Sequence, residues 1–240
     1  MNNITFALGT HTGLVRELNE DSYLAAPEVG LWAIADGMGG HEAGEVASRI
    51  AVQEILHGVK SGMSLSKAVD SAHYAIQQAA AQGEGGRNMG STIVAVQFHD
   101  CDYEIVWVGD SRAYLWNGNL TQLTKDHSYV QSLLDAGLID KDQIPGHPYR
   151  NVISQALGTG GPDDEDIEPE LVSGRLGPSE TLLLCSDGLT GAVADREIAA
   201  ILAESEDNQI KVNRLIQAAL TAGGRDNITV VVISLDAPAG

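Results

Sequence analysis

The stretch from residue 91 to residue 123 constrains the fold of this 240-residue chain more than any other, because it has the pattern of four successive strands. Residues 91–98 and 103–108 are rich in β-branched and aromatic side chains, and a polar connection of hairpin length joins them. Residues 113–116 then turn at Asn117-Gly118 into residues 120–123. Strands joined by such short turns pair antiparallel. The stretch therefore predicts a β-meander and excludes a doubly wound parallel fold, in which single strands alternate with helices.

The rest of the chain adds helices in pairs and further strands. Helical periodicity marks residues 42–59 and 65–79, with Ser64 as N-cap of the second helix, and later residues 127–136, 195–203 and 209–222. Strand patterns cover residues 4–10, 22–26, 31–35, 181–185 and 228–235. Paired helices suggest that each pair covers the outer face of a sheet, so we expect an α+β fold, a β-sandwich flanked by helices. No repeat, linker or shift in composition divides the sequence, which predicts one domain over residues 1–240.

Three aspartates occupy turns beside apolar strands: Asp36, Asp187 and Asp226. If these strands share a sheet, the carboxylates converge, and like charges in a partly buried site need a counter-charge. The three turns contain no Cys or His, and hard oxygen ligands favour Mg²⁺, Mn²⁺ or Ca²⁺ over zinc. The alternative is that Asp-Gly only forms turns, which explains any one of them alone. Three strand-adjacent turns together favour a metal site.

Composition limits the partners of the chain. The formal net charge of −19, from 33 acidic and 14 basic residues, argues against a nucleic-acid partner. A hydrophobic content of 43% is ample for a core, and no apolar stretch or N-terminal pattern indicates membrane insertion or secretion, so we expect a soluble, cytoplasmic protein. Cys101 and Cys185 fit no zinc pattern, and buried or incidental thiols are the default expectation.

Seven motifs occur in a fixed order along the chain. They are Arg16-Glu17-Leu18-Asn19-Glu20-Asp21, Asp36-Gly37-Met38-Gly39-Gly40, Gly90-Ser91-Thr92, Gly109-Asp110-Ser111-Arg112, Leu123-Thr124-Lys125-Asp126-His127-Ser128, Ser186-Asp187-Gly188-Leu189 and Arg225-Asp226-Asn227-Ile228-Thr229. Together they resemble the metal-dependent Ser/Thr protein phosphatases of the PPM, or type 2C, family in its compact bacterial form. The resemblance implies a four-layer α-β-β-α sandwich with two mainly antiparallel sheets and two metal ions between them.

The resemblance also assigns metal ligands. Asp36 would bridge both ions, and the carbonyl oxygen of Gly37 would bind the first. Glu20, Asp187 and Asp226 would hold the second ion directly or through water.

Three further residues receive roles in the same way. Asp21 would lie in the outer shell of the metals, and Asp110 would hold, with Asp187, a third and weaker ion. Arg16 would grip the substrate phosphate, because a guanidinium gives two parallel hydrogen bonds to phosphate oxygens. The alternative for Arg16 is a surface salt bridge with Glu17 or Glu20.

The implied activity is hydrolysis of phosphoserine and phosphothreonine in proteins by a water or hydroxide that bridges two Mn²⁺ or Mg²⁺ ions. The partners would be phosphoproteins and a cognate bacterial Ser/Thr kinase system, and the protein would be a monomer. The alternative is a catalytically silent, acidic metal-binding regulator on the same fold. The presence of Asp36, Asp187 and Asp226 disfavours that alternative, because silent relatives are expected to lose metal ligands.

One position departs from many eukaryotic relatives. They have His where this chain has Met38, and that His is often proposed to protonate the leaving alkoxide. Met38 cannot donate a proton, so the general acid is open among His41, His127, His147 and a metal-bound water.

Residues 140–169 lack regular periodicity, and such a long irregular segment is usually functional. They lie where bacterial members of the family carry a mobile flap beside the active site. His147, Arg150 and Asn151 are the candidate flap residues, and the glycines at 158, 160 and 161 would permit hinge motion. We expect the segment to govern the choice of protein substrate; the alternative is an ordered structural loop.

Overall fold

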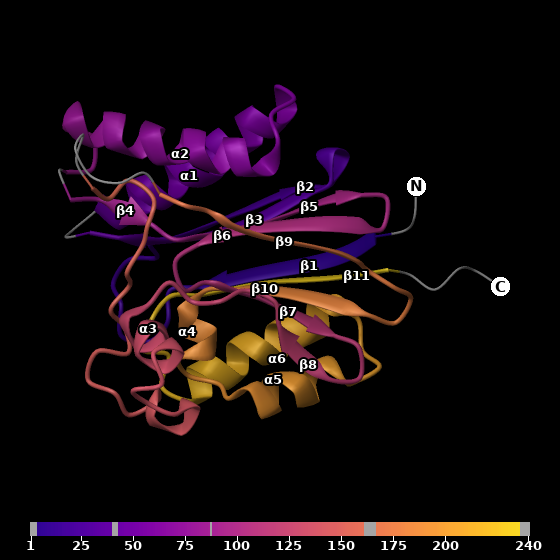
Figure 1. Cartoon of the computed structure of the whole chain (residues 1–240). Helices are drawn as coiled ribbons and strands as arrows, with labels where there is room; N and C mark the ends of the chain where they lie inside the picture. Colours follow the sequence, from indigo (N-terminus) through magenta and orange to yellow (C-terminus); the bar gives the residue numbers. More distant parts are fainter. Residues whose placement is uncertain (1–3, 40–42, 87, 161–166, 236–240) are drawn as a thin grey trace.

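Two antiparallel sheets lie face to face between two layers of helices (Figure 1). The computed structural model describes residues 4–39, 43–86, 88–160 and 167–235. The expected α-β-β-α sandwich is therefore confirmed in its layers.

The first sheet lies under the N-terminal helices. β2 (Asp21–Ala26), β3 (Leu31–Met38), β5 (Ile93–His99), β6 (Asp102–Val108) and β9 (Glu170–Arg175) pair in this order, and β4 (Gly90–Ser91) pairs with the end of β3. Helices α1 (Ala43–Lys60) and α2 (Leu65–Ala81) cover its outer face with apolar side chains such as Ile55 and Ile76. The backbone N–H of Lys67 donates to Ser64, which caps α2 as expected. Among the described residues, no helix combines the length and apolar character needed to cross a membrane.

The second sheet is formed mainly by the two ends of the chain. Its order is β1 (Ile4–His11), β11 (Ile228–Leu235), β10 (Thr181–Cys185), β7 (Arg112–Trp116) and β8 (Leu120–Gln122). Helices α4 (Asp187–Thr190), α5 (Asp195–Leu202) and α6 (Asn208–Thr221) lie on its outer face, where Leu189, Ile198 and Leu215 are buried. Cys101 and Cys185 are both buried thiols.

The inner faces of the two sheets enclose a separate apolar core around Trp32. The Trp32 ring meets Phe6 of the second sheet and Phe98 of its own sheet edge to face, with centroids 5.4 Å and 5.8 Å away. Such contacts add to the free energy gained from burial of the rings. This core holds the sheets together and so fixes the edge at which their acidic residues meet.

The prediction of one meander over residues 91–123 is wrong. β5 and β6 form a hairpin in the first sheet, whereas β7 and β8 form a hairpin in the second. The chain crosses between the sheets at Gly109, which has a φ of 106°, and a Cβ there would lie 2.7 Å from the Thr92 side chain. Short spacing between strands predicted antiparallel pairing but not the change of sheet. The crossing leaves Asp110 buried between the two sheets.

Two strand boundaries also differ from the expectation. The strand expected at 31–35 continues to Met38, so Asp36 and Gly37 lie in β3 and not in a turn after it. The strand expected at 91–98 is interrupted at Thr92, because the backbone N–H of Thr92 donates to the Asp36 carbonyl at 2.8 Å. Both differences arise because the end of β3 pairs with the short strand β4. The alternation of apolar and polar residues along the sequence does not reveal this pairing.

Four elements were not predicted, and one starts later than expected. β9 is an exposed edge strand of sequence Glu-Leu-Val-Ser-Gly-Arg, α4 has four residues, and η1 (Pro27–Val29) and η2 (Lys141–Gln143) are short 3₁₀ turns. The helix expected at 127–136 is α3 (Tyr129–Asp135), because Ser128 accepts a hydrogen bond from Gln131 N and caps it. The start expected for the first helix at residue 42 lies outside the described residues.

Candidate active site

Strand pairing brings four aspartates to one edge of the sandwich. Asp21 lies directly opposite Asp36 in the β2–β3 ladder. Asp187 follows β10 and Asp226 shortly precedes β11, and because these strands are antiparallel neighbours, both aspartates come to the same end of the second sheet. The convergence expected from the sequence is therefore present.

Burial and mutual repulsion dominate the electrostatics of this group. Burial raises the pKa of Asp36 well above its ordinary value, and the charges of Asp21, Asp187, Asp110 and Asp226 raise it further. For the same leading reason, burial, the pKa of Asp187 rises to about 6, that of Asp21 to about 7 and that of Asp110 to about 8. Asp187 and Asp36 share a hydrogen bond, which two carboxylates cannot form without a proton between them. Within the described residues, one ion pair, between Arg16 and Asp226, compensates only part of this negative charge.

Two carboxylate oxygens in this region are buried without a partner among the described residues: Glu20 Oε1 and Asp21 Oδ1. The other oxygen of Asp21 accepts from Ser186 Oγ at 2.8 Å and from Thr229 Oγ1 at 2.6 Å, so the carboxylate is held in place. An unpaired buried carboxylate oxygen is costly unless something binds it. Hard cations bind such oxygens, and the residues present therefore fit a divalent metal.

The carboxylates do not form a closed cage on their own. Within the described ranges, no group of three or more His, Cys, Asp or Glu side chains is arranged so as to hold a metal ion by itself. Mg²⁺ and similar hard cations usually keep several waters and take only one or two carboxylates directly. An open cluster supplemented by water is the arrangement that these side chains allow.

Glycines permit the close approach of β3, α1 and the Glu20 segment. A Cβ at Gly37 would lie 2.0 Å from the carbonyl oxygen of Gly44, and a Cβ at Gly44 would lie 2.4 Å from Glu20 Oε1. The backbone of Gly44 hydrogen-bonds the Glu20 carboxylate, while burial raises the pKa of that group. Any larger residue at position 37 or 44 would push Glu20 away from Asp36.

Asn227 ties the loop before β2 to the turn before β11. Its Nδ2 donates to the carbonyls of Thr12 (2.9 Å) and Leu18 (2.8 Å), and its Oδ1 accepts from the backbone N–H of Glu20 (2.8 Å). One buried amide thereby fixes both the Glu20 backbone and the residue next to Asp226. Asn227 lies inside one of the seven motifs, but no role was predicted for it from the sequence.

Arg16 lies on the same loop and points at the acidic cluster. Its Nη2 donates to Asp226 Oδ2 at 2.8 Å, and half of the Arg16 side chain remains exposed. The alternative, a salt bridge of Arg16 with Glu17 or Glu20, is wrong, because the ion pair of Arg16 forms with Asp226. No other described residue hydrogen-bonds the Arg16 side chain, so its remaining N–H groups can bind an anion that approaches from solvent.

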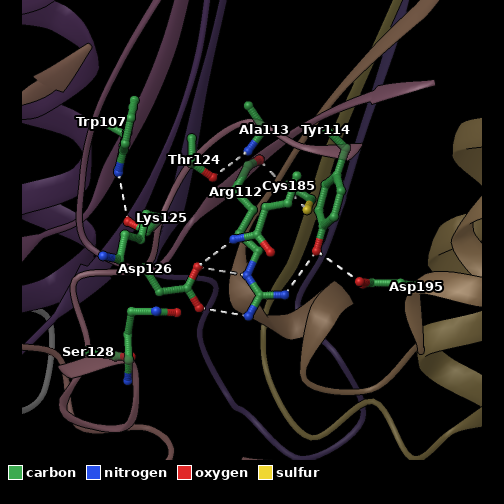
Figure 2. Close-up of polar contacts among 12 residues, drawn as sticks. Trp107, Arg112, Ala113, Tyr114, Thr124, Lys125, Asp126, Ser128, Cys185 and Asp195 are labelled. Atoms are coloured by element: carbon green, nitrogen blue, oxygen red, sulfur yellow. Dashed lines mark hydrogen bonds and ion pairs between the residues drawn. The ribbon is translucent and has the colours of Figure 1, made fainter. Parts of the chain in front are cut away.

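Two residues after Asp110, Arg112 belongs to a second group of charges. In this group opposite charges are paired. Figure 2 shows the Arg112 guanidinium forked onto Asp126, with Nε donating to Oδ1 at 2.8 Å and Nη2 to Oδ2 at 2.7 Å. Arg112 Nη1 donates to the Tyr114 hydroxyl at 2.9 Å, and that hydroxyl donates to Asp195 at 3.2 Å (Figure 2). This network joins β7, the segment before α3 and the start of α5. It fixes the strand that follows Asp110.

The histidines considered as proton donors differ in position. His127 is buried, its Nδ1 accepts from Gly109 N at 3.2 Å and its Nε2 lies 3.2 Å from Glu170 Oε1, so both ring nitrogens are engaged in supporting the crossing between the sheets. His147 accepts from Tyr149 N at 3.2 Å and lies beside the Tyr129 ring. His41 lies outside the described residues.

The segment 140–169 is anchored in its second half. Leu157 exchanges two backbone hydrogen bonds with Ser91, of 3.0 Å and 2.7 Å. Gly158 has a φ of 79°, and a Cβ there would lie 2.1 Å from the Ile76 side chain, so it is a packed turn against α2. Arg150 and Asn151 are exposed on the first half, which lies near α3. Residue 161 and the five that follow lie outside the described part of the chain.

Comparison with known proteins identifies the family. The family model described as protein phosphatase 2C matches residues 9–221. The Ser/Thr protein phosphatase PstP of Mycobacterium tuberculosis is 39% identical over 236 residues, which cover 95% of this chain and 44% of that protein. The Ser/Thr phosphatase stp of Listeria monocytogenes is 35% identical over 241 residues, covering 95% of this chain and 94% of that protein. The chain thus spans less than half of the mycobacterial relative and nearly all of the listerial one.

Solved structures agree with this assignment. The crystal structure of the PstP catalytic domain in complex with two manganese ions superposes with a TM-score of 0.86 at 36% identity, covering 98% of this chain and 99% of that one. Sequence, fold and the converging carboxylates lead to the same conclusion: the chain belongs to the protein phosphatase 2C family.

Proposed function

We propose that this protein is a metal-dependent phosphatase that hydrolyses phosphoserine and phosphothreonine in proteins. The observation that carries the proposal is the partly buried carboxylate cluster around Asp36, with unpaired oxygens on Glu20 and Asp21 and with Arg16 at its rim. A phosphate monoester repels nucleophiles, so its hydrolysis needs both charge neutralisation and a fixed phosphate. The cluster suits a divalent cation, and Arg16 suits the phosphate.

Two ions, Mn²⁺ or Mg²⁺, would be held by the residues that strand pairing brings together. Asp36 would contact both, the Gly37 carbonyl would serve the first, and Glu20, Asp187 and Asp226 would serve the second. When bound, such a pair of ions lowers the pKa of a coordinated water and offsets the negative charge of the phosphate. This donor set contains only oxygen, which agrees with the hard cations named and not with zinc.

Supporting residues would keep these ligands in place. The hydrogen bonds of Ser186 and Thr229 orient Asp21 as an outer-shell group. Asp110 is buried at the crossing between the sheets, and repulsion by Asp187 helps to raise its pKa. We place a third, weaker ion between Asp110 and Asp187, where it would relieve that repulsion.

Arg16 would bind the phosphate while Asp226 orients its guanidinium. Because one edge of the guanidinium is already bonded to Asp226, the other edge can give parallel hydrogen bonds to two phosphate oxygens. His127 is an unsuitable general acid, since both of its nitrogens are engaged in the fold. A proton for the leaving alkoxide would come from His41, His147 or a metal-bound water.

The surroundings of Arg16 favour a protein substrate over a small phosphate ester. Leu14 and Val15, the two residues before Arg16, are 66% and 65% exposed. They are not loosely held, because Leu14 N donates to the Gly224 carbonyl at 2.6 Å and Asn227 binds the loop on both sides of them. A rigid apolar rim beside a phosphate site suits contact with a polypeptide. We name Leu14 and Val15 the apolar rim.

The same proposal extends to partners and context. The segment 140–169, with His147, Arg150 and Asn151, would act as a flap that contacts the substrate protein. A bacterial Ser/Thr kinase system would supply the phosphoproteins. We place the protein in the cytoplasm as a monomer with one domain over residues 1–240.

Release of p-nitrophenol from p-nitrophenyl phosphate tests the activity. Turnover should require Mn²⁺ or Mg²⁺ and stop with excess EDTA, and a phosphothreonine peptide should be hydrolysed under the same conditions. A silent metal-binding regulator would bind Mn²⁺ in calorimetry but release no p-nitrophenol. Turnover unaffected by EDTA would contradict the metal site itself.

A further inference from the structure

Two buried hydroxyl groups meet beside Asp36, where the chain crosses between the sheets. Thr92 and Ser111 are each 1% exposed, and their side-chain oxygens lie 2.8 Å apart. Thr92 directly follows β4 in the first sheet, whereas Ser111 directly precedes β7 in the second. Neither residue is among the proposed metal ligands or phosphate-binding groups. Their hydrogen bond links the two sheets at the edge that carries the carboxylate cluster.

Thr92 binds Asp36 through both the N–H and the carbonyl group of the Asp36 backbone. The Asp36 N–H donates to Thr92 Oγ1 at 3.1 Å, and the Thr92 N–H donates to the Asp36 carbonyl at 2.8 Å. The two bonds lie where β3 stops pairing with β5 and starts pairing with β4. Only the main chain of Asp36 takes part, so its carboxylate stays available to the cluster.

Ser91 adds a further contact to the same backbone. Ser91 is buried, and its Oγ lies 3.1 Å from the Asp36 carbonyl and 2.8 Å from the Thr92 carbonyl, with one proton to share between them. The Ser91 main chain in turn pairs with Leu157. Asp36 is therefore held within the first sheet by Ser91 and Thr92 and, through the Thr92 hydroxyl, to Ser111 of the second.

The methyl group of Thr92 has a different partner from its hydroxyl group. It packs against Gly109, where a Cβ would lie 2.7 Å from Thr92 Cγ2. The backbone of Gly109 is fixed by His127, whose Nδ1 accepts from Gly109 N and whose N–H donates to the Gly109 carbonyl. Valine at position 92 would keep the methyl contact and lose the hydroxyl, and serine would do the reverse. Substitution can thus separate packing from hydrogen bonding at this position.

We propose that Thr92 and Ser111 are positioning residues, which fix the backbone of Asp36 relative to the Asp110 segment and thereby the separation of the carboxylates on the two sheets. This inference rests on the metal-dependent activity proposed above. Loss of a hydrogen bond that orients a metal ligand typically costs about 10- to 100-fold in metal affinity or activity. Neither hydroxyl needs to touch an ion or the substrate, so both act only through Asp36 and the segment that contains Asp110.

Kinetics with p-nitrophenyl phosphate and Mn²⁺ test the proposal. Thr92→Val should lower kcat about tenfold, and Ser111→Ala, which leaves the bonds between Asp36 and Thr92 intact, should lower it about fivefold. KM should change less than kcat, because Arg16 lies on a separate loop. Thr92→Ser keeps the hydroxyl and should restore most of the wild-type kcat. The double variant Thr92→Val/Ser111→Ala should be no slower than Thr92→Val, since both substitutions break the same link.

Two measurements do not depend on turnover. In EDTA, the Asp36 N–H should exchange with solvent about tenfold faster in Thr92→Val than in the wild type, because its acceptor is gone. The amide of Val94, in the buried centre of β5, reports global unfolding and serves as the reference within each variant. Calorimetry should show weaker Mn²⁺ binding in Thr92→Val and in Ser111→Ala.

Thr5→Val is the matched control. Thr5 Oγ1 lies 3.3 Å from Ser234 Oγ in a similar hydroxyl pair, at the far end of β11 from Asp226. This variant should keep the wild-type kcat, Mn²⁺ affinity and relative exchange rate of Asp36, even where its stability falls. Wild-type kcat and Mn²⁺ affinity in a folded Thr92→Val variant, or a Thr92→Ser variant as slow as Thr92→Val, would overturn the inference.

Failure of the proposed function would look different. A wild-type protein without Mn²⁺-dependent turnover would refute the phosphatase, whatever the variants do. Amide exchange and calorimetry would then still decide whether Thr92 and Ser111 position Asp36. Unchanged exchange and unchanged Mn²⁺ binding in both Thr92→Val and Ser111→Ala would count against the positioning role alone.

Discussion

Two groups of buried charges lie within a few residues of each other and differ in every respect that matters for function. In the carboxylate cluster around Asp36, like charges face one another and some oxygens have no partner. In the Arg112–Asp126 pair, the guanidinium gives two hydrogen bonds to the carboxylate and a third to Tyr114 (Figure 2). A buried ion pair with satisfied hydrogen bonds holds a fold in one arrangement, whereas an uncompensated cluster needs a ligand. The comparison separates scaffold from active site.

Asp187→Asn should give the largest effect, because Asp187 is proposed to serve the second ion and the third. With saturating Mn²⁺, we expect the kcat for p-nitrophenyl phosphate to fall about 1000-fold, or about 4 kcal/mol in activation free energy. Without metal, the variant should be at least as stable as the wild type, because one repelling charge is gone. Steady-state kinetics and urea unfolding in EDTA measure both. Asp142→Asn, an exposed acid on η2, is the matched control, and wild-type turnover in Asp187→Asn would refute the site.

Arg112→Ala should produce the opposite effect on stability. Removal of one partner leaves the largely covered Asp126 carboxylate without its counter-charge, which we expect to lower the free energy of unfolding by about 3 kcal/mol. The double variant Arg112→Met/Asp126→Leu should recover most of that loss, since no charge remains buried. Urea unfolding in EDTA gives the comparison with Asp187→Asn directly. If both single variants shift stability in the same direction, the distinction between the two groups fails.

The site was more predictable than the topology around it. Asp36, Asp187 and Asp226 could be proposed because each follows or precedes a short apolar run. In the structure Asp187 and Asp226 flank their strands, whereas Asp36 lies within β3. The sheet to which each strand belongs is decided by contacts between distant segments. The crossing at Gly109 was therefore not predicted, and the structure has two hairpins where one meander was expected.

The supporting residues were missed for a related reason. Asn227 acts through three bonds to a loop more than 200 residues away in sequence. β9 escaped prediction because it is an exposed edge strand with little apolar alternation. Tertiary packing alone makes these residues notable.

The stability of the metal-free protein should depend on pH in a way that reveals the cluster. The folded pKa values of Asp187, Asp21 and Asp110, about 6, 7 and 8, exceed that of an exposed aspartate, about 3.9. Between about pH 4 and pH 8, the folded chain then binds more protons than the unfolded chain, so stability falls as pH rises. We expect the free energy of unfolding in EDTA to be at least about 2 kcal/mol lower at pH 8 than at pH 5.

Saturating Mn²⁺ should reverse that trend, because metal binds the ionised carboxylates and competes with protons. Urea unfolding at pH 5 and pH 8, with Mn²⁺ and with EDTA, provides the four measurements. Arg112→Ala should steepen the slope in EDTA, since the charge of Arg112 lowers the pKa values of Asp187 and Asp110 in the folded chain. A metal-free protein that is more stable at pH 8 than at pH 5 would contradict the assigned shifts.

The smallest effect is expected for substitutions in the apolar rim. These test contact with the substrate protein and not the pairing of charges. Leu14→Ser/Val15→Ser should raise the KM for a phosphothreonine peptide with apolar flanking residues about threefold, because exposed apolar area of this size contributes less than 1 kcal/mol. The KM for p-nitrophenyl phosphate should not change, since that ester lacks flanking residues. Arg16→Ala should raise the KM for both substrates alike, about tenfold, because both present a phosphate to the guanidinium.

Ile210→Ser on α6 removes a similarly exposed apolar side chain remote from Arg16 and serves as the control. An equal change for both substrates in the rim variant would show that Leu14 and Val15 support the position of Arg16 and do not contact the peptide.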